Sequence, residues 1–240
     1  MASRKYREKV HRHRLYPAVA IRQHVLMHTS LGHDVASIAS NLGDGGIHIW
    51  LIDYHRSQQR RPLQALLGVY LSLPAEAVIL IDGEHGRPDL APPWNQVLQF
   101  NWSHSVDKAI IAITRHVAPG IDIECIRPRP RAMQLAERFF HPEEVAALQA
   151  LDKHRREIAF LQLWTSKEAV LKALGRGVTF GLHRLHLSVA SESPDLLWLD
   201  GDDATQWQLH CLKIDCDHVA SLAWRGPSLA VDIWTLAENG

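Results

Sequence analysis

The stretch WTSKEAVLKALG, residues 164–175, has the apolar spacing of a helix that packs one face against a core. At about 100° per residue, its apolar side chains fall on one arc, and Glu168 and Lys172 lie together at the edge of that arc. Lys167 projects into the middle of the arc. Burying an unpaired charge is costly, so the pattern predicts an anionic partner for Lys167. This helix therefore carries reactive charges beside its apolar face.

The composition of the chain is that of a globular protein large enough to bury a substantial core. It has 240 residues, 46% hydrophobic and 22% charged, enough for one large domain or two small ones. The formal net charge is zero, which does not favour a nucleic-acid partner. Residues 1–44 are locally basic, with seven Lys/Arg against three Asp/Glu, so the remainder is slightly acidic.

The three cysteines, Cys125, Cys211 and Cys216, form no C-x-x-C pair, and their odd number argues against a disulfide framework. No apolar run approaches the roughly 18 residues that a membrane span needs. The basic N-terminus is not followed by the apolar segment of a secretory signal. These features predict a reducing, cytoplasmic location without a membrane partner.

The sixteen histidines raise the question of a metal site. The pairs His11/His13 and His183/His186 have no cysteine or carboxylate at the spacing of zinc ligands. They are interpreted as scattered surface histidines rather than as ligands.

The order of the expected elements predicts an α+β protein of two similar halves. Residues 1–44 lack sustained periodicity and are interpreted as a basic N-terminal extension, which could be disordered. The N-terminal half is then 45–119 and the C-terminal half 120–240. Each half has a strand, then helix, then antiparallel strands. The first has strands at 47–52, 78–81, 100–105 and 109–114 with a helix at 62–73. The second has strands at 120–124, 185–190, 206–214 and 218–224, with a helix start at 141 and a long helix at about 155–174.

Two carboxylates stand on one face of a predicted strand. In Ile121-Asp122-Ile123-Glu124, the period of two places Asp122 and Glu124 on the same face, about 7 Å apart. Two such acids repel unless a cation joins them, and hard oxygen ligands suit Mg²⁺. The alternative is a strand with a solvated outer face. For Glu168 and Lys172, the alternative is an ordinary ion pair on a helix surface.

Four motifs in this order resemble a known family. They are GRP at 86–88, FNWSHS at 100–105, GIDIE at 120–124 and W-x-x-K-E-x-x-x-K-x-x-G at 164–175. Together they closely resemble the 4′-phosphopantetheinyl transferases of the surfactin-synthetase-activating type. The resemblance covers roughly residues 47–225, and the last two motifs are the specific ones. It implies two tandem pseudosymmetric α+β halves in a monomer, with coenzyme A bound in the cleft between them.

The resemblance also implies an activity and a set of site residues. Phosphopantetheine would move from coenzyme A to a serine of an acyl, polyketide or peptidyl carrier protein, releasing 3′,5′-ADP. Asp122, Glu124 and Glu168 would hold Mg²⁺, with Mn²⁺ as the alternative ion. Glu168 would be the base, directly or through water, and Lys172 would neutralise and protonate the leaving group. Coenzyme A would contact Arg56, Arg61, Arg87, Ser103, His104, Lys167 and Lys172.

Some features depart from the family's pattern. The family usually has a longer charged loop after its first strand, whereas only residues 54–59 stand between Asp53 and Arg60. Arg87 replaces the lysine that is common in the first motif. Residues 1–44 have no evident counterpart, and could be a tail that this transferase can lose.

Competing interpretations remain open. One is a non-catalytic homologue that binds coenzyme A or a carrier protein without turnover. Another is a nucleic-acid binder, which rests only on the basic residues 1–24. For a carrier partner, Arg127, Arg129 and Arg131 with exposed apolar groups near Phe139-Phe140 could receive an acidic helix; the alternative is a solvated loop before a helix.

Overall fold

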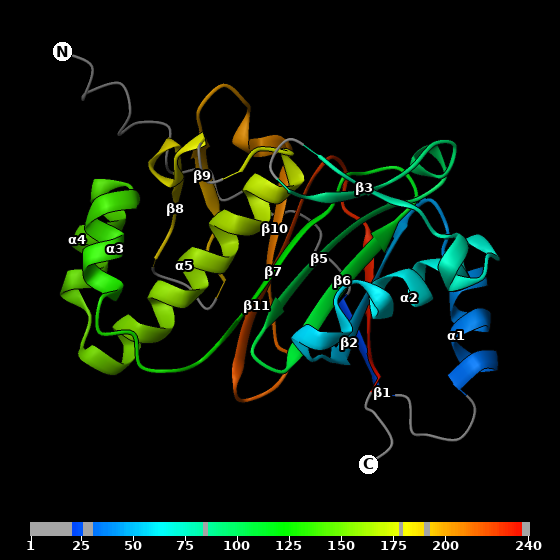
Figure 1. Cartoon of the computed structure of the whole chain (residues 1–240). Helices are drawn as coiled ribbons and strands as arrows, with labels where there is room; N and C mark the ends of the chain where they lie inside the picture. Colours follow the sequence, from blue (N-terminus) through cyan, green and yellow to red (C-terminus); the bar gives the residue numbers. More distant parts are fainter. Residues whose placement is uncertain (1–20, 26–30, 84–85, 178–179, 190–192, 237–240) are drawn as a thin grey trace.

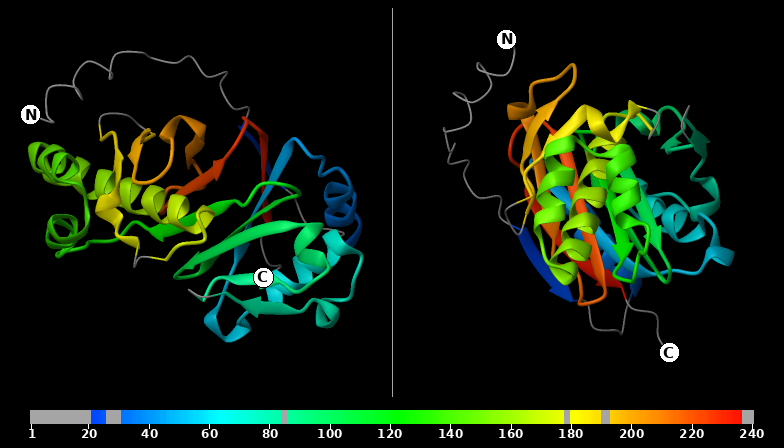
Figure 2. Two further views of the ribbon diagram at one scale, coloured as in Figure 1. Left: turned by 90° about the horizontal axis from the view of Figure 1, so that it is seen from above. Right: turned by 90° about the vertical axis from the view of Figure 1, so that its left-hand side faces the viewer.

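The computed structural model describes the backbone of residues 21–25, 31–83, 86–177, 180–189 and 193–236. Two lobes lie side by side (Figures 1 and 2). The strands of the first lobe are β1 (Ile21–Val25), β2 (Gly46–Asp53), β5 (Gln99–Ser105), β6 (Lys108–Thr114) and β12 (Ala230–Leu236), in the order β1-β12-β2-β6-β5. The second lobe has β7 (Gly120–Cys125), β10 (Trp207–Leu212) and β11 (His218–Arg225), in the order β10-β11-β7.

Helices and two small sheets complete the lobes. The first lobe adds α1 (Leu31–Ser40), α2 (Arg61–Leu71) and the strand pair β3 (Leu80–Asp82) and β4 (Pro88–Leu90). The second adds α3 (Ala132–Phe139), α4 (Pro142–Ala150), α5 (Lys153–Ala173) and the pair β8 (Leu185–Leu187) and β9 (Leu196–Leu199). The long helix and the main strands lie where the sequence pattern predicts them.

The two lobes repeat one arrangement. In the first, β2 pairs antiparallel with β6, and β6 with β5; in the second, β7 pairs antiparallel with β11, and β11 with β10. A helix follows the first strand of each unit, α2 after β2 and α5 after β7 with α3 and α4 between. The prediction of two similar α+β halves is confirmed.

The core is layered because the sheets are buried on both faces. On β2, Ile47, Ile49 and Leu51 face the second lobe's strands, whereas Trp50 and Ile52 face α2. A further cluster joins α5 to its own sheet and to α3 and α4. The layers run from α2 through the two sheets to α5, and burial on both faces explains the nearly continuous apolar runs of β2 and β6.

Gly120 allows α5 to lie directly against β7. A Cβ at this position would stand 1.9 Å from the carbonyl oxygen of Ala169 and 2.5 Å from the nitrogen of Ala173, both in the backbone of α5. No side chain larger than hydrogen fits without moving the helix. The contact brings Glu168 and Lys172 of α5 close to the carboxylates of β7.

The structure corrects the predicted boundaries. Residues 21–25 form β1, which runs parallel to β12, and 31–40 form α1, whose Val35 and Ala39 are buried together with the following Leu42. The interpretation of 1–44 as an extension outside the fold is therefore wrong for these segments; residues 1–20 and 26–30 lie outside the described residues. The half 120–240 is not a separate unit either, because β12 lies between β1 and β2 of the first lobe.

Deleting residues 1–44 should therefore destabilise the protein rather than leave it unchanged. The deletion removes the apolar contacts of α1 and the edge strand beside β12, and Leu42→Ala alone should cost about 2–5 kcal/mol of unfolding free energy. Thermal and urea unfolding measure both effects, with Ser37→Ala on the exposed side of α1 as the control. A deletion variant with the melting temperature of the full chain would make this segment dispensable.

Candidate active site

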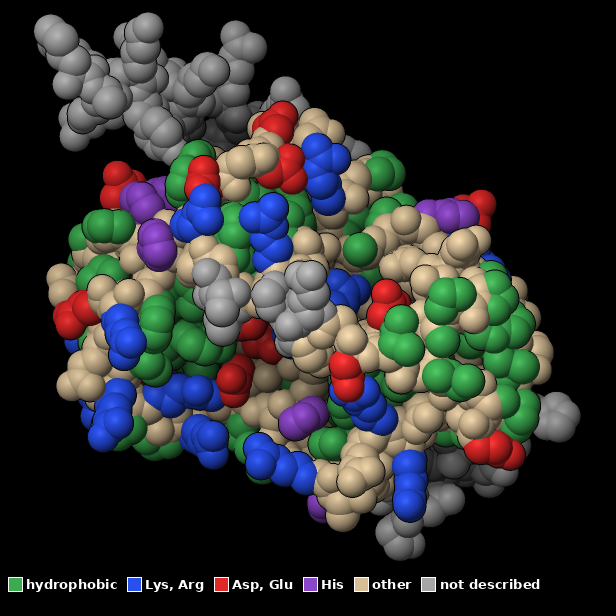
Figure 3. All heavy atoms as spheres, turned by 45° about the horizontal axis from the view of Figure 1, so that its top comes forward, with side chains coloured by type: hydrophobic (Ala, Val, Ile, Leu, Met, Phe, Trp, Pro, Cys, Tyr) green, Lys and Arg blue, Asp and Glu red, His purple; other side chains and the backbone are tan. Residues whose placement is uncertain are grey.

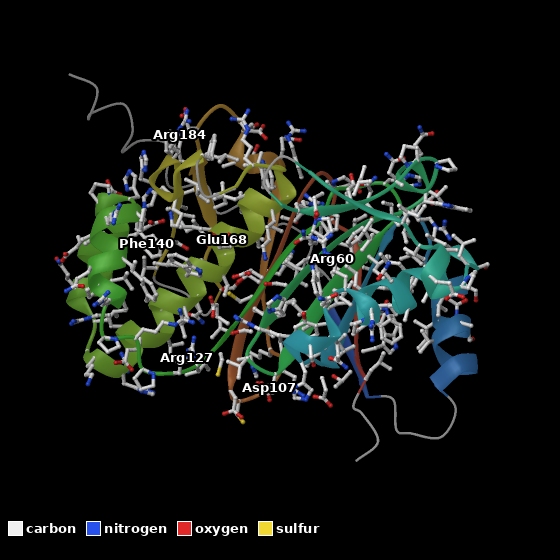
Figure 4. The ribbon with its side chains drawn as sticks, viewed as in Figure 1. Arg60, Asp107, Arg127, Phe140, Glu168 and Arg184 are labelled. Carbon is white, nitrogen blue, oxygen red and sulfur yellow. The ribbon has the colours of Figure 1, made fainter. Side chains whose placement is uncertain are left out.

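The predicted site residues meet where β5, β7 and α5 come together. β5 and β7 belong to different sheets but lie side by side, and we call this line of contact the seam. In Figure 4, Glu168 lies on α5 in the second lobe, and Arg60 of the first lobe lies to its right. Figure 3 shows acidic side chains in the middle of the upper face, with Lys and Arg side chains along one border.

Polar side chains of β5 bridge the seam. Asn101 Oδ1 accepts a hydrogen bond from the backbone nitrogen of Ile121 at 2.9 Å, and Ser105 Oγ accepts one from that of Cys125 at 3.0 Å. Between them, Ser103 Oγ donates to Asp122 Oδ1 at 2.8 Å. Every second residue of β5 thus faces β7, and Ser103, predicted to bind phosphate, orients a carboxylate here.

Both carboxylates of β7 are held by cations. Lys172 Nζ lies 2.8 Å from Asp122 Oδ1 and also donates to the carbonyl of Ile121 at 2.9 Å. Arg129 Nη2 lies 2.5 Å from Glu124 Oε2, and Ser105 Oγ donates to the same oxygen at 3.3 Å. The Asp122–Lys172 pair joins the strand motif to the helix motif. Arg129 is a partner that the sequence did not reveal.

Glu168 is the third carboxylate and lacks such a partner. Its Oε1 atom is buried and has no hydrogen-bond partner among the described residues. Burial raises the pKa of Glu168 to about 7, and the negative charges of Asp122 and Glu124 add to the rise while Lys172 opposes it. A carboxyl group with this pKa exchanges its proton near neutral pH.

The donor set of the three acids fits a hard divalent cation. An orphaned buried oxygen and the mutual repulsion of Asp122, Glu124 and Glu168 are what such an ion would relieve. Within the part of the chain that the structure describes, these three acids are not among the groups whose ligand atoms all lie within 4.8 Å of one another. Lys172 and Arg129 hold two of them, so an ion must compete with these cations.

Two clefts flank the acids. One, of about 480 Å³, is lined by Gly86, Arg87, Pro88, Asn101, Trp102, Glu168, Lys172, Gly175, Arg176 and Gly177. The other, of about 730 Å³, is lined by Tyr54, Arg56, Gln59, Arg60, Arg61, Gln64 and His104. The structure thus gathers Arg56, Arg61 and His104, which the sequence predicted as contacts of coenzyme A.

The second cleft is strongly basic. The pKa of His104 is lowered by burial and by the positive charges of Arg56 and Lys172. Its ring lies 4.9 Å from that of Tyr54. Arg60, labelled in Figure 4, also lines this cleft and pairs with Asp82. Sequence reasoning missed Arg60 and Tyr54 as lining residues, although the Arg60-Arg61 pair at the helix start was a visible signal.

Lys167 is not in the cleft, which corrects its prediction as a contact of coenzyme A. Its side chain is fully buried, and Nζ lies 2.8 Å from Glu144 Oε2 of α4. The same ammonium donates to the carbonyls of Leu182 at 2.9 Å and Leu185 at 2.6 Å. Burial lowers its pKa to about 8, against the opposing effect of Glu144. The expected anionic partner is a carboxylate of the protein core.

Arg87 forms hydrogen bonds with both lobes. Its guanidinium donates to the backbone carbonyls of Lys172 in α5, Phe100 in β5 and Pro119 before β7. Burial lowers its pKa. Arg87 also lines the smaller cleft, and because both of its Nη atoms donate to these carbonyls, its contacts position the elements of the site.

The apolar groups near Phe139-Phe140 are not exposed as predicted. Phe140 is 4% exposed and stacks on Phe160 at 5.4 Å between ring centroids, and Phe139 is half-buried. Phe140, the residue after α3, packs against the rings of Phe160 and Trp164 in α5, and Phe139 packs against the same apolar cluster. Arg127 and Arg131 are exposed, whereas Arg129 is paired with Glu124.

Carboxylates and a lysine between two repeated α+β lobes, beside a basic cleft, define a class of enzyme that handles an anionic substrate. Comparison with known proteins identifies that class. Residues 118–225 match the model of the 4′-phosphopantetheinyl transferase superfamily. The 4′-phosphopantetheinyl transferase HetI of Nostoc is 32% identical over 173 residues, which cover 72% of this chain and 71% of that protein. The chain belongs to the 4′-phosphopantetheinyl transferase superfamily.

Two further relatives agree with this assignment. A Synechocystis protein provisionally named a 4′-phosphopantetheinyl transferase is 32% identical over 154 residues, 62% of this chain and 61% of that protein. The 4′-phosphopantetheinyl transferase psf-1 of Bacillus pumilus is 35% identical over 136 residues, 55% of each chain. The match thus spans less than two thirds of these two relatives. The resemblance found in the sequence is confirmed.

No helix in the described ranges is both long and apolar enough to cross a bilayer.

Proposed function

We propose that this protein transfers the 4′-phosphopantetheine group of coenzyme A to a serine hydroxyl of a carrier protein and releases 3′,5′-ADP. One observation carries the proposal: Glu168, whose buried Oε1 atom has no hydrogen-bond partner among the described residues, stands beside Asp122 and Lys172 and lines the smaller cleft. The family membership of the chain supports the same reaction.

The basic cleft suits the polyanionic end of coenzyme A. Arg56, Arg61 and His104 are all exposed around this cleft. Guanidinium groups bind phosphate oxygens through paired hydrogen bonds, so the two arginines would hold the 3′-phosphate and His104 a phosphate of the diphosphate bridge. This arrangement would place the diphosphate near Lys172.

The acids and the lysine then divide the chemistry. Glu168 takes the proton of the serine hydroxyl, directly or through water, while the serine oxygen bonds to the β-phosphorus of coenzyme A. The bond from that phosphorus to the bridging oxygen breaks, and the electron pair leaves with 3′,5′-ADP. Lys172 neutralises this leaving group and gives it a proton. Such chemistry requires alignment and charge neutralisation more than a covalent nucleophile.

Asp122, Glu124 and Glu168 would hold a magnesium ion, or manganese in its place. When bound, the ion supplies positive charge to the phosphate oxygens in the transition state. For it to bind, Arg129 must release Glu124, which makes Arg129 a competitor for that carboxylate. A magnesium affinity that rises in Arg129→Gln would support this relation, and an unchanged affinity would contradict it.

Mass spectrometry of an apo carrier protein tests the proposed reaction. The carrier should gain one phosphopantetheine group when incubated with this chain, coenzyme A and Mg²⁺, and none when EDTA is present. If the protein binds coenzyme A but neither an acyl nor a peptidyl carrier gains mass, the protein is a binding homologue without turnover. If Arg56 and Arg61 contact the 3′-phosphate, the KM for dephospho-coenzyme A should be higher than the KM for coenzyme A.

The carrier would approach along exposed arginines. Arg127, labelled in Figure 4, and Arg131 lie on the loop between β7 and α3, close to the acids of β7. Reversing both to glutamate should raise KM for the carrier several-fold, leave KM for coenzyme A unchanged and weaken the salt dependence of the rate. Arg184→Glu, at the other end of this lobe in Figure 4, is the matched control. An unchanged carrier KM would move the docking surface elsewhere.

The enzyme would act as a monomer in which the two lobes replace the two subunits of a dimer. Cys125, Cys211 and Cys216 are all free, which supports the proposal of a reducing, cytoplasmic location.

A further inference from the structure

Three potential metal ligands meet outside the two clefts. His141 precedes α4, Glu143 lies in its first turn, and His186 lies on β8. One ligand atom from each lies within 4.8 Å of the other two. The imidazole rings are nearly parallel with centroids 4.3 Å apart, and His186 Nε2 is 3.7 Å from Glu143 Oε2. None of the three residues lines either cleft.

One buried carboxylate fixes the backbone at both histidines. Glu144 Oε2 accepts from the backbone nitrogen of His141 at 2.9 Å, and Oε1 accepts from that of Leu187 at 2.7 Å. Lys167, the partner of Glu144, holds the carbonyl of Leu185 at 2.6 Å. The residues on each side of His186 are therefore tied to the same fully buried ion pair as His141. The two rings are held together by the core rather than by chance contact at the surface.

The local charge favours a cation. The side chain of His186 is buried, and a neutral imidazole offers a ring-nitrogen lone pair to a metal. The charges of Glu144 and Lys167 cancel, and the carboxylate of Glu143 adds one negative charge. That side chain is 73% exposed and therefore has room to turn towards the rings.

We propose that His141, Glu143 and His186 bind a zinc ion that joins the start of α4 to β8. Two histidines and one carboxylate form a known zinc ligand set, with water in the fourth position. Imidazole ligands select zinc and related transition metals over magnesium, so this ion would differ from the one proposed at Asp122. Ligands of one tetrahedral zinc lie about 3.3 Å apart at bond lengths of about 2.05 Å, so the side chains must close by rotation.

The site would stabilise the support of the long helix. Zinc would connect α4 and β8 on the outer side of the Glu144–Lys167 pair, and Lys167 belongs to α5. The sequence could not reveal this cluster because His186 lies 43 residues after Glu143 along the chain. Judged by spacing alone, His186 had no carboxylate partner.

Zinc binding to the full-length, EDTA-treated chain tests the proposal. Competition with a chromophoric chelator measures the affinity, and the visible spectrum of the Co²⁺ form reports nitrogen ligands in a four-coordinate site. His141→Ser keeps a side-chain oxygen to cap α4 but removes the imidazole. Glu143→Gln removes the exposed carboxylate charge. Each variant should weaken the tightest zinc site at least tenfold and lose the rise in melting temperature that zinc gives the unaltered chain.

Matched controls separate this site from the other histidines and acids. His183→Ser alters an exposed histidine three residues from His186, and Asp122→Asn alters the proposed magnesium site. Both should retain the zinc affinity and the Co²⁺ spectrum of the unaltered chain. The proposal is overturned if the unaltered chain has no zinc site tighter than that of an isolated surface histidine. It is also overturned if His141→Ser and Glu143→Gln both bind zinc with unaltered affinity.

Discussion

Glu168→Gln should lower kcat for phosphopantetheine transfer by about 10²–10⁴-fold, the usual contribution of a positioned general base. The Oε1 atom of Glu168 is buried beside Asp122 and Lys172 without a hydrogen-bond partner among the described residues, and the pKa of about 7 suits proton exchange near neutral pH. Glutamine keeps the shape of the side chain but can neither take the serine proton nor contribute charge to a cation. The affinity for magnesium should fall together with the rate.

Steady-state kinetics and calorimetric titration with magnesium measure the two effects separately. Glu76→Gln, the same substitution at an exposed position of the first lobe, is the control. Asp122→Asn should be comparably inactive, because it removes both a ligand and the partner of Lys172. Near-normal turnover by Glu168→Gln would leave the helix motif with a structural role alone.

The same carboxyl group should also affect stability without metal. The pKa of Glu168 is raised from 4.5 to about 7, so between these pH values the native state binds more protons than the unfolded state. The unfolding free energy therefore decreases as the pH rises from 4.5 to 7, by on the order of 3 kcal/mol. The unfolding free energy of Glu168→Gln should not show this decrease with pH. In the unaltered chain, saturating magnesium should offset the decrease. Urea unfolding in EDTA at pH 5 and pH 8 measures this change in unfolding free energy. The same change in the unaltered chain and in Glu168→Gln would contradict the prediction.

Lys167→Met should lower the unfolding free energy by about 3–5 kcal/mol, the usual cost of breaking a buried ion pair from one side. The substitution leaves the fully buried carboxylate of Glu144 without its cation. It also leaves the carbonyls of Leu182 and Leu185 without a donor. The loss thus falls on the packing of α4 and β8 around the long helix.

A double-mutant cycle with Glu144→Gln isolates the pair. The double variant should lose less stability than the sum of the two single variants, because neither charge is then buried alone. At a temperature where Lys167→Met is still folded, its KM for coenzyme A should equal that of the unaltered chain. If Lys167→Met instead kept full stability and had a raised KM for coenzyme A, Lys167 would be a contact of coenzyme A.

Local pattern was enough to predict much of this protein. The period of two in Ile121-Asp122-Ile123-Glu124 placed two acids on one face, and the period of the long helix placed Glu168 and Lys172 at its edge. These statements depend on backbone geometry alone, which neighbouring residues determine. The position of Lys167 on the apolar arc required an anion, and an anion is there.

Local pattern also contained a signal that was missed. Val35, Ile38, Ala39 and Leu42 have the i, i+3, i+4, i+7 spacing of an amphipathic helix. The stretch is short and follows a basic segment without periodicity, so the sequence around it favours an extension. Its buried residues show that α1 belongs to the first lobe.

Only the tertiary structure decided which distant groups meet. Lys167 pairs with Glu144 across 23 residues, Arg87 bonds to the carbonyl of Lys172 across 85, and β12 inserts between β1 and β2 from the far end of the chain. Periodicity describes which way a side chain points from its own element, but not which element lies opposite. That choice depends on how the layers pack, because burial energy is summed over the whole molecule and not along one segment.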